Sequence, residues 1–300
     1  MFSHTIPPPY ETQSRISINF HNPFLSTMAT ANLFFSLVIS VLILSLSVSA
    51  ADWNILLNQR KTRYGLQITL KNYCESWRMN VELHNIRYFD TVPEECVEYI
   101  GRYMTSTQYK VDFERTIDEC TVYLSTSCGF KKDGSDAWIF DIDDTLLSTV
   151  PYYKKNGFGF GVDIKLCKLC RGKKSNSTAL EEWMRQGKAP ALEHSLRLFN
   201  QLRGLGVQII LVSSRRECLR SATIDNLVNV GYHGWTSLIL RGADDENKDV
   251  EKFKADVRKQ LISGGGYRIW GILGDQWSSI EGLPSAKRTF KLPNPLYYVA

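Results

Sequence analysis

The chain has 300 residues, of which 43% are hydrophobic and 22% charged, and this is ordinary globular usage that allows a substantial core. Its 36 Lys and Arg against 31 Asp and Glu give a net charge of +5. The basic residues are scattered rather than gathered in a stripe, so their distribution predicts no nucleic-acid surface and only mildly favours anionic substrates.

The first 50 residues do not have the pattern of a folded domain. We interpret residues 1–27, which are polar and contain Pro7-Pro8-Pro9, as an upstream extension of the reading frame. Residues 28–50 contain an apolar run from Leu33 to Val48 and end in small residues, which predicts a cleaved signal peptide and entry into the secretory pathway, to an extracellular or vacuolar destination. A signal anchor is the alternative, because no Lys or Arg lies between Met28 and the run, but the run is short for a membrane span. Cleavage would leave no stable span.

The seven cysteines fit a secreted protein in which disulfides can form. Four of them lie in one region and leave three pairings open: Cys74, Cys96, Cys120 and Cys128. Cys167 and Cys170 form a single CxxC, which is a weak zinc signal without a second pair, so a local disulfide or two inert thiols is our interpretation.

The sequence of residues 51–130 predicts an N-terminal helical region. Pro93 followed by two glutamates is typical of a helix start, and a second helical pattern runs from Val111 to Leu124. The two segments predict a helical hairpin packed on the main domain, which would span residues 131–300.

The main domain opens with a short apolar run, Trp138 to Phe140, that leads into three carboxylates, Asp141, Asp143 and Asp144. This pattern is typical of a buried parallel strand that ends in a functional loop. If the extended geometry continued, Asp141, Asp143 and Thr145 would share one face, and two carboxylates so close require a cation or a shared proton. Both requirements suit phosphoryl transfer.

A calcium loop is excluded at this position. Counted from Asp141, the sixth and twelfth places of such a loop hold Leu146 and Tyr152 instead of Gly and Glu.

The segment between Thr149 and Ser177 predicts a loop insertion that overhangs the site. Pro151-Tyr152-Tyr153 and the glycines between Asn156 and Gly161 are typical of loops. Asn176 begins the sequon Asn-Ser-Thr and is the predicted glycosylation site, and Thr178 and Glu181 form a capping-box pattern that predicts a helix through Met184.

The rest of the chain alternates between helical and strand patterns. Helices are expected near 192–205, 218–230 and 250–262, and strands near 207–212, 238–240 and 267–273. This alternation predicts an α/β fold with a Rossmann-like parallel sheet flanked by helices. Because ligands bind at the carboxyl ends of such strands, Asp141, Ser213 and Asp275 are expected to converge. From its helical position alone, Lys254 is as compatible with a solvated surface as with a site.

The motifs taken together resemble the haloacid dehalogenase superfamily of phosphohydrolases. The four segments that carry this resemblance occur in the expected order, and they are Asp141-Ile142-Asp143-Asp144-Thr145, Ser213, Lys254 and Gly274-Asp275. Four stretches are similar to plant acid phosphatases and vegetative storage proteins: Phe140 to Lys155, Gly231-Tyr232-His233, Gly274 to Ser278 and Lys291 to Tyr298.

The resemblance implies a role for each matching residue. Asp141 would be the nucleophile that forms an aspartyl-phosphate, and Asp143 the general acid and base. Thr145, Ser213 and Lys254 would bind the phosphoryl oxygens. Mg²⁺ would be held by the Asp141 carboxylate, the Asp143 backbone carbonyl and Asp275, with Asp144 outside the ligand set or structural.

The sequence departs from the family pattern at Ser279. The fourth motif commonly carries a second Asp at this place, and Glu281 is the nearest acid that can replace it. The region from Cys167 to Lys174 also departs from the pattern as an insertion, which bears on substrate access.

Two functions follow from the resemblance. The first is an acid phosphatase acting on small phosphomonoesters, and the second is a vegetative storage protein with weak or no activity. Histidine acid phosphatases are excluded because the chain lacks an Arg-His-Gly run. A homodimer is an open alternative to a monomer.

Overall fold

The computed structural model describes residues 60–61, 65, 67–89, 91–159 and 179–300, all of which belong to one unit, Asn58–Ala300. The predicted extension and signal peptide, the CxxC pair, the sequon at Asn176 and the residue that would cap the following helix lie outside the described residues. Within the described ranges, no helix is both long enough and apolar enough to cross a membrane.

A five-stranded parallel sheet forms the centre of the fold, with the strand order β5-β4-β3-β6-β7. The strands are β3 (Asp136–Phe140), β4 (Gln208–Arg216), β5 (Ser237–Arg241), β6 (Arg268–Gly274) and β7 (Arg288–Lys291). This order, with helical crossovers between the strands, confirms the predicted Rossmann-like sheet. The sequence did not predict β7, which is short and mostly polar.

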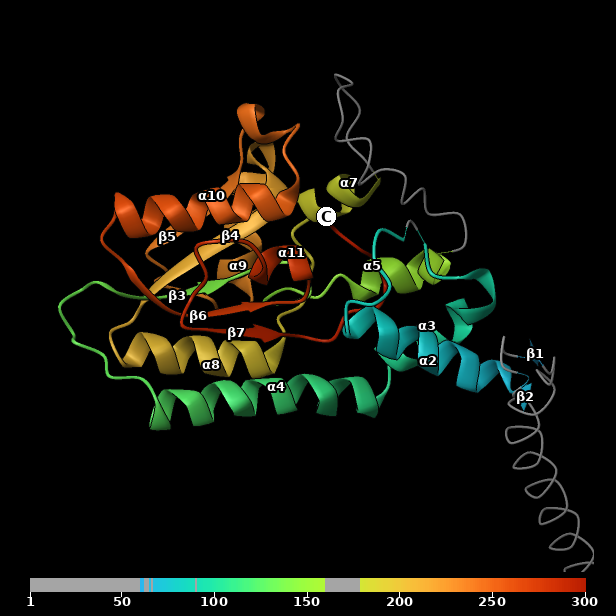
Figure 1. Cartoon of the computed structure of the whole chain (residues 1–300). Helices are drawn as coiled ribbons and strands as arrows, with labels where there is room; N and C mark the ends of the chain where they lie inside the picture. The colour runs from blue at the N-terminus through green and yellow to red at the C-terminus, as the bar shows by residue number, and fades with distance from the viewer. Residues whose placement is uncertain (1–59, 62–64, 66, 90, 160–178) are drawn as a thin grey trace, which may run out of the picture. The chain divides into compact units, whose positions relative to one another are not determined.

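Helices cover both faces of the sheet (Figure 1). Every residue of β3 is buried, so its alternate side chains enter two separate cores. Trp138 and Phe140 pack in the core that includes α8 (Glu193–Gly204) and α9 (Arg220–Asn229), and Ala137 and Ile139 pack in the core that includes α10 (Val250–Ser263). Helix α4 (Thr107–Thr126) lies against α8.

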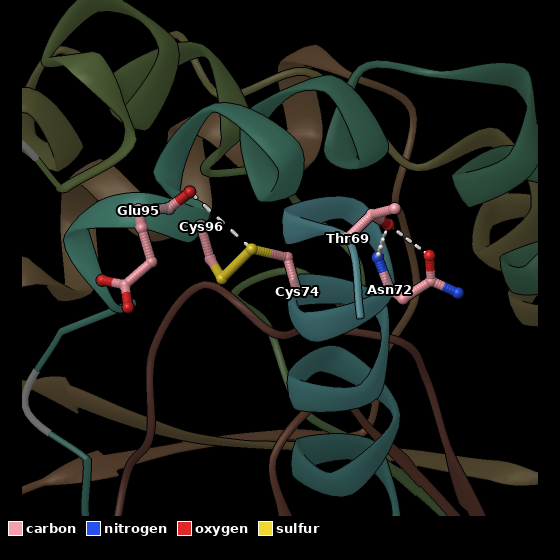
Figure 2. Close-up of a disulfide and its surroundings, with 5 residues drawn as sticks. All are labelled: Thr69, Asn72, Cys74, Glu95 and Cys96. Atoms are coloured by element: carbon pink, nitrogen blue, oxygen red, sulfur yellow. Dashed lines mark hydrogen bonds between the residues drawn. A yellow bond between two sulfur atoms is a disulfide. The ribbon is translucent and has the colours of Figure 1, made fainter. Parts of the chain in front are cut away.

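The N-terminal region contains the predicted hairpin and one helix that was not predicted. The hairpin consists of η1 (Glu94–Cys96), α3 (Val97–Met104) and α4. The unpredicted helix, α2 (Leu70–Glu82), begins after Thr69, whose side chain accepts a hydrogen bond from the Asn72 amide at 3.1 Å (Figure 2). Before it, β1 (Arg60–Lys61) and β2 (Gln67–Ile68) form a small antiparallel pair.

One disulfide joins two of these elements, from Cys74 in α2 to Cys96 in η1 (Figure 2). This bond belongs to one of the pairings that the sequence left open, but Cys120 and Cys128, which would form its second bond, are free thiols, as is Cys218. The bond closes the loop that leads from α2 to α3, because it joins Cys74 before the loop to Cys96 at its far end.

The expected loop at Pro151-Tyr152-Tyr153 is wrong, because these residues lie in α5 (Val150–Lys155). Pro151 occupies the first turn, where its missing N–H costs nothing, and both tyrosine side chains are buried. The remaining short helices are η2 (Gly157–Gly159), α7 (Ala179–Arg185), η3 (Glu217–Leu219), η4 (Ala243–Asp245) and α11 (Trp277–Ile280).

Gly271 in β6 provides a test of the sheet packing. A Cβ atom at this position would lie 2.4 Å from the Trp138 ring, which is fully buried and has no room to move. We expect Gly271→Ala to lower the free energy of unfolding by about 1–3 kcal/mol, as overpacking does elsewhere. Urea unfolding measures this change. Gly204→Ala is the matched control, because a Cβ atom there meets nothing within 4 Å. Equal stability of the two variants would contradict the tight packing of Gly271 against the Trp138 ring.

Candidate active site

The register of the sheet brings the expected motifs to one edge. Phe140 pairs with Leu211 of β4 and with Leu273 of β6, so Asp141 is level with Val212 and Gly274. The Asp141 amide continues this ladder with a bond of 3.0 Å to the Leu273 carbonyl. Ser213, which lies inside β4, and Asp275, which follows β6, each come one residue further on, so the register places all three residues at this edge of the sheet. The expected end of β4 at residue 212 is wrong, because the strand continues to Arg216.

The chain after β3 does not stay extended. The Ile142 carbonyl accepts from the amides of Leu146 at 2.8 Å and Leu147 at 2.9 Å, and Asp144 has a φ of +45°. The backbone therefore folds into a tight turn. The expectation that Asp141, Asp143 and Thr145 share one face of a strand is wrong, and each of the three has different partners.

Asp141 lies in a buried cluster with Lys254 and Ser279. The Lys254 Nζ is 2.5 Å from Asp141 Oδ2 and 2.9 Å from Ser279 Oγ, and the Ser279 hydroxyl donates to the same Asp141 oxygen at 2.6 Å. Lys254 is only 3% exposed, so it belongs to the site and not to the solvated surface of α10. Ser279 links the ammonium and carboxylate groups as acceptor from one and donor to the other.

Gly274 allows this cluster to close. A Cβ atom at this position would lie 2.6 Å from the Ser279 Cβ, so any larger residue would push α11 away from β6. The close approach explains in physical terms why a glycine precedes Asp275.

Asp143 has a separate cationic partner, Arg215 of β4. The guanidinium donates from Nε at 2.9 Å and from Nη2 at 2.7 Å to the two carboxylate oxygens, and its Nη1 donates to Thr223 at 3.0 Å. Burial works against the Arg215 charge, but Asp143, together with the nearby Asp141 and Tyr297, outweighs burial and the pKa of Arg215 is raised. Our sequence reasoning missed Arg215. Its position two residues after Ser213 on a strand was the available signal, because alternate residues share a face.

Ser213 and Thr145 are both fully buried. The Ser213 Oγ accepts from the Arg215 amide at 3.2 Å, and the Thr145 hydroxyl lies 3.4 Å from Asp275 Oδ1. Thr145 therefore lies beside Asp275, and Ser213 lies beside Arg215, which is the partner of Asp143.

Asp275 is almost completely buried, and the side chains in the described ranges that hydrogen-bond to it are all neutral: Thr145, Gln276, Asn294 and Tyr297. Burial, followed by the nearby charge of Asp141, raises the pKa of Asp275 to about 6. Two acids with oxygen donors at one buried point fit a hard divalent cation such as Mg²⁺. No group of three or more His, Cys, Asp or Glu side chains in the described ranges is arranged to hold a metal.

Asp144 is fully buried on the other side of the turn. It accepts from the Thr149 amide at 2.8 Å, from the Thr149 hydroxyl and from the Tyr297 hydroxyl at 2.8 Å. Burial, followed by the charge of Asp275, raises the pKa of Asp144 to about 7. These contacts give Asp144 a structural place in the loop.

Glu281 does not replace the acid that is missing at Ser279. Its carboxylate lies 2.9 Å from the Nδ1 of His84 and is 37% exposed, so it is engaged outside the Asp141 cluster. Ser279 itself contacts Asp141 and Lys254.

A family model described as "HAD superfamily, subfamily IIIB (Acid phosphatase)" matches residues 59–300. The chain belongs to this acid phosphatase family. The prediction of a haloacid dehalogenase-like acid phosphatase is thereby confirmed, and acid phosphatases of this superfamily typically depend on a metal.

Curated relatives include both enzymes and storage proteins. Acid phosphatase 1 of Solanum lycopersicum is 40% identical over 75% of this chain and 83% of its own. Vegetative storage protein 1 of Arabidopsis thaliana is 39% identical over 78% of this chain and 82% of its own. The Stem 28 kDa glycoprotein of Glycine max is 40% identical over 79% and 88% of the two chains.

A solved structure supports the fold of the acid phosphatase family. The class C acid phosphatase from Bacillus anthracis, crystallised with tungstate, has a TM-score of 0.52 and 19% identity over 67% of this chain and 85% of its own. At this identity the likeness concerns the fold.

The raised pKa of Asp144 predicts a pH-dependent contribution to stability. Between pH 4 and 7 the carboxyl of the unfolded chain has lost its proton while that of the folded chain keeps it. The contribution of Asp144 to the free energy of unfolding is therefore most favourable near pH 4 and falls as the pH rises toward 7. Asp144→Asn removes this titration, so wild-type stability relative to Asp144→Asn should fall over this range. Urea unfolding at several pH values, with chelator present, measures the difference. Parallel pH profiles for the two proteins would contradict the raised pKa.

Proposed function

We propose that the protein is a magnesium-dependent acid phosphatase that hydrolyses small phosphomonoesters through an aspartyl-phosphate on Asp141. The observation that carries the proposal is the buried contact between Asp141 and Lys254 at the sheet edge where Asp275 also lies. A carboxylate nucleophile, an ammonium group and a second acid in one place are the groups that phosphoryl transfer requires.

In the first step an Asp141 oxygen attacks phosphorus and the bond to the ester oxygen breaks. To act as the acid, Asp143 would first take up a proton and release one of its two contacts with Arg215; it then gives this proton to the departing alkoxide, so no free alkoxide is released. In the second step Asp143 takes a proton from water as the water attacks phosphorus. The bond to Asp141 then breaks and phosphate leaves.

The neighbouring side chains would orient the reacting groups. Lys254 is already placed against the nucleophile, and its ammonium can hold a phosphoryl oxygen as charge develops. Ser213 and Thr145 would supply hydroxyl donors to the other oxygens. Arg215 holds both oxygens of the Asp143 carboxylate and so fixes its direction.

Mg²⁺ would be held by the carboxylates of Asp141 and Asp275 and by the Asp143 backbone carbonyl. When bound, the ion would offset the negative charge of the phosphoryl group and the nucleophile. The neutral contacts of Asp275 support this assignment, because they leave its charge without a bonded cation among the described residues.

A storage role with weak or no turnover is the second candidate function. It is favoured by the similarity to Vegetative storage protein 1 and by the hydroxyl of Ser279 at a place where the family commonly has an acid. Loss of such an outer partner of a metal typically costs about 10- to 100-fold in affinity or activity. Asp141, Asp143 and Lys254 are nevertheless all present.

Entry into the secretory pathway through a signal peptide at residues 28–50, with glycosylation at Asn176, remains a prediction. The similarity to the soybean stem glycoprotein supports it. The small phosphomonoester substrate, the absence of a nucleic-acid partner and the homodimer alternative likewise remain predictions.

Asp141→Asn is the decisive variant for the catalytic proposal. An amide cannot act as the nucleophile, so hydrolysis of p-nitrophenyl phosphate at mildly acidic pH with Mg²⁺ should fall by at least about 1,000-fold. Excess chelator should abolish the wild-type reaction. Asp244→Asn is the matched control, since Asp244 is an exposed carboxylate on η4.

Two results would overturn this mechanism. Wild-type turnover by Asp141→Asn would exclude the covalent intermediate. A folded wild-type protein with no turnover above the variant would favour the storage role.

A further inference from the structure

Residues 292–300, here called the tail, follow β7 and cross the carboxyl edge of the sheet (Figure 1). The Leu292 amide donates to the Gly274 carbonyl at 2.9 Å, and the Val250 amide at the start of α10 donates to the Ala300 carbonyl at 2.6 Å. Between these two contacts the tail passes the acids of the site.

Asn294 is the first tail residue that contacts Asp275. Its Nδ2 donates to Asp275 Oδ2 at 2.7 Å, and its Oδ1 accepts from the Leu296 amide at 3.0 Å. The second contact fixes which side of the amide faces the acid, because only the NH₂ group can donate. Asn294 is 2% exposed, so it has little freedom to move away.

Tyr297 connects the same acid to Asp144. Its hydroxyl is 2.8 Å from Asp144 Oδ2 and 3.3 Å from Asp275 Oδ2, so one hydroxyl proton is shared between two buried carboxylates. The ring stacks on Tyr153 of α5, with centroids 5.5 Å apart, and this contact holds the hydroxyl in place.

The tail also fixes Gln276. The Val299 amide donates to Gln276 Oε1 at 3.0 Å, and Gln276 Nε2 donates to Asp275 Oδ2 at 2.9 Å. Three donors therefore converge on Oδ2, while Oδ1 has, among the residues that the structure describes, only the 3.4 Å contact with Thr145. Since the three bonds set the rotation of the carboxylate, Oδ1 is the oxygen left to bind an ion.

We infer that Asn294 and Tyr297 are positioning residues that orient Asp275 for a divalent cation, so that the tail is part of the metal site. The inference rests on the proposed function, in which Asp275 is a metal ligand. The two residues act through Asp275 and contact neither the ion nor the substrate.

Mg²⁺ binding to the purified full chain tests the inference without any assay of turnover. We expect Tyr297→Phe and Asn294→Ala each to raise the dissociation constant, measured by calorimetry near neutral pH, by about 10-fold. Tyr298→Phe is the matched control, because the neighbouring hydroxyl contacts His84 at 3.2 Å and neither acid. Its affinity for Mg²⁺ should equal that of the wild type. Thermal unfolding in chelator reports the stability of each variant separately from its metal affinity.

Asp275→Asn separates this inference from the proposed function. If Asp275→Asn loses Mg²⁺ binding while Tyr297→Phe and Asn294→Ala bind as the wild type does, the inference is overturned and the metal assignment stands. If Asp275→Asn binds Mg²⁺ normally, or if the wild type binds none, the metal assignment fails and the inference with it. Equal weakening by Tyr298→Phe would show a general packing effect and would also overturn the inference.

Discussion

Charge compensation at one edge of the sheet is the constraint on which the rest of the site depends. Asp141, Asp144 and Asp275 are buried together where β3 and β6 end, and an unpaired buried carboxylate is costly. Asp141 obtains a cation from α10, whereas the hydrogen-bond donors to Asp144 and Asp275 among the described residues are neutral and the pKa values of both acids rise. This difference distinguishes the proposed nucleophile, held beside an ammonium group, from Asp275, which has no bonded cation among those residues.

The groups that satisfy these acids come from distant parts of the chain. Arg215 lies 72 residues from Asp143, Lys254 lies 113 residues from Asp141, and Tyr297 lies 153 residues from Asp144. The N-terminal region also reaches the loop after β6. His84, in the loop closed by the Cys74–Cys96 disulfide, stacks on Trp277 with ring centroids 4.7 Å apart. These contacts make the geometry of the site a property of the whole fold.

The buried polar network favours a catalytic over a purely structural interpretation. A buried ion pair contributes little net stability, and apolar replacements of similar volume are often neutral or stabilising. The contact between Lys254 and Asp141 therefore has no strong justification in folding alone. The proposed function would explain it, because phosphoryl transfer requires a carboxylate and a cation in one place. Ser279 fits the same cluster, because its hydroxyl joins the two groups by hydrogen bonds.

The sequence by itself determined every strand of the sheet except β7, and the edge of the sheet at which the motifs meet. Apolar runs that end in polar residues gave β3, β4 and β6, and the common direction of parallel strands brought Asp141, Ser213 and Asp275 to one edge. These features are local, so periodicity and short motifs suffice to predict them. Only the tertiary structure decided the partners of the acids: Arg215 for Asp143, and Asn294 and Tyr297 for Asp275. It also showed that Lys254 is buried, that the chain turns after Asp141, and that Cys74 pairs with Cys96. Contacts between residues far apart in sequence depend on packing and burial, which no local pattern records.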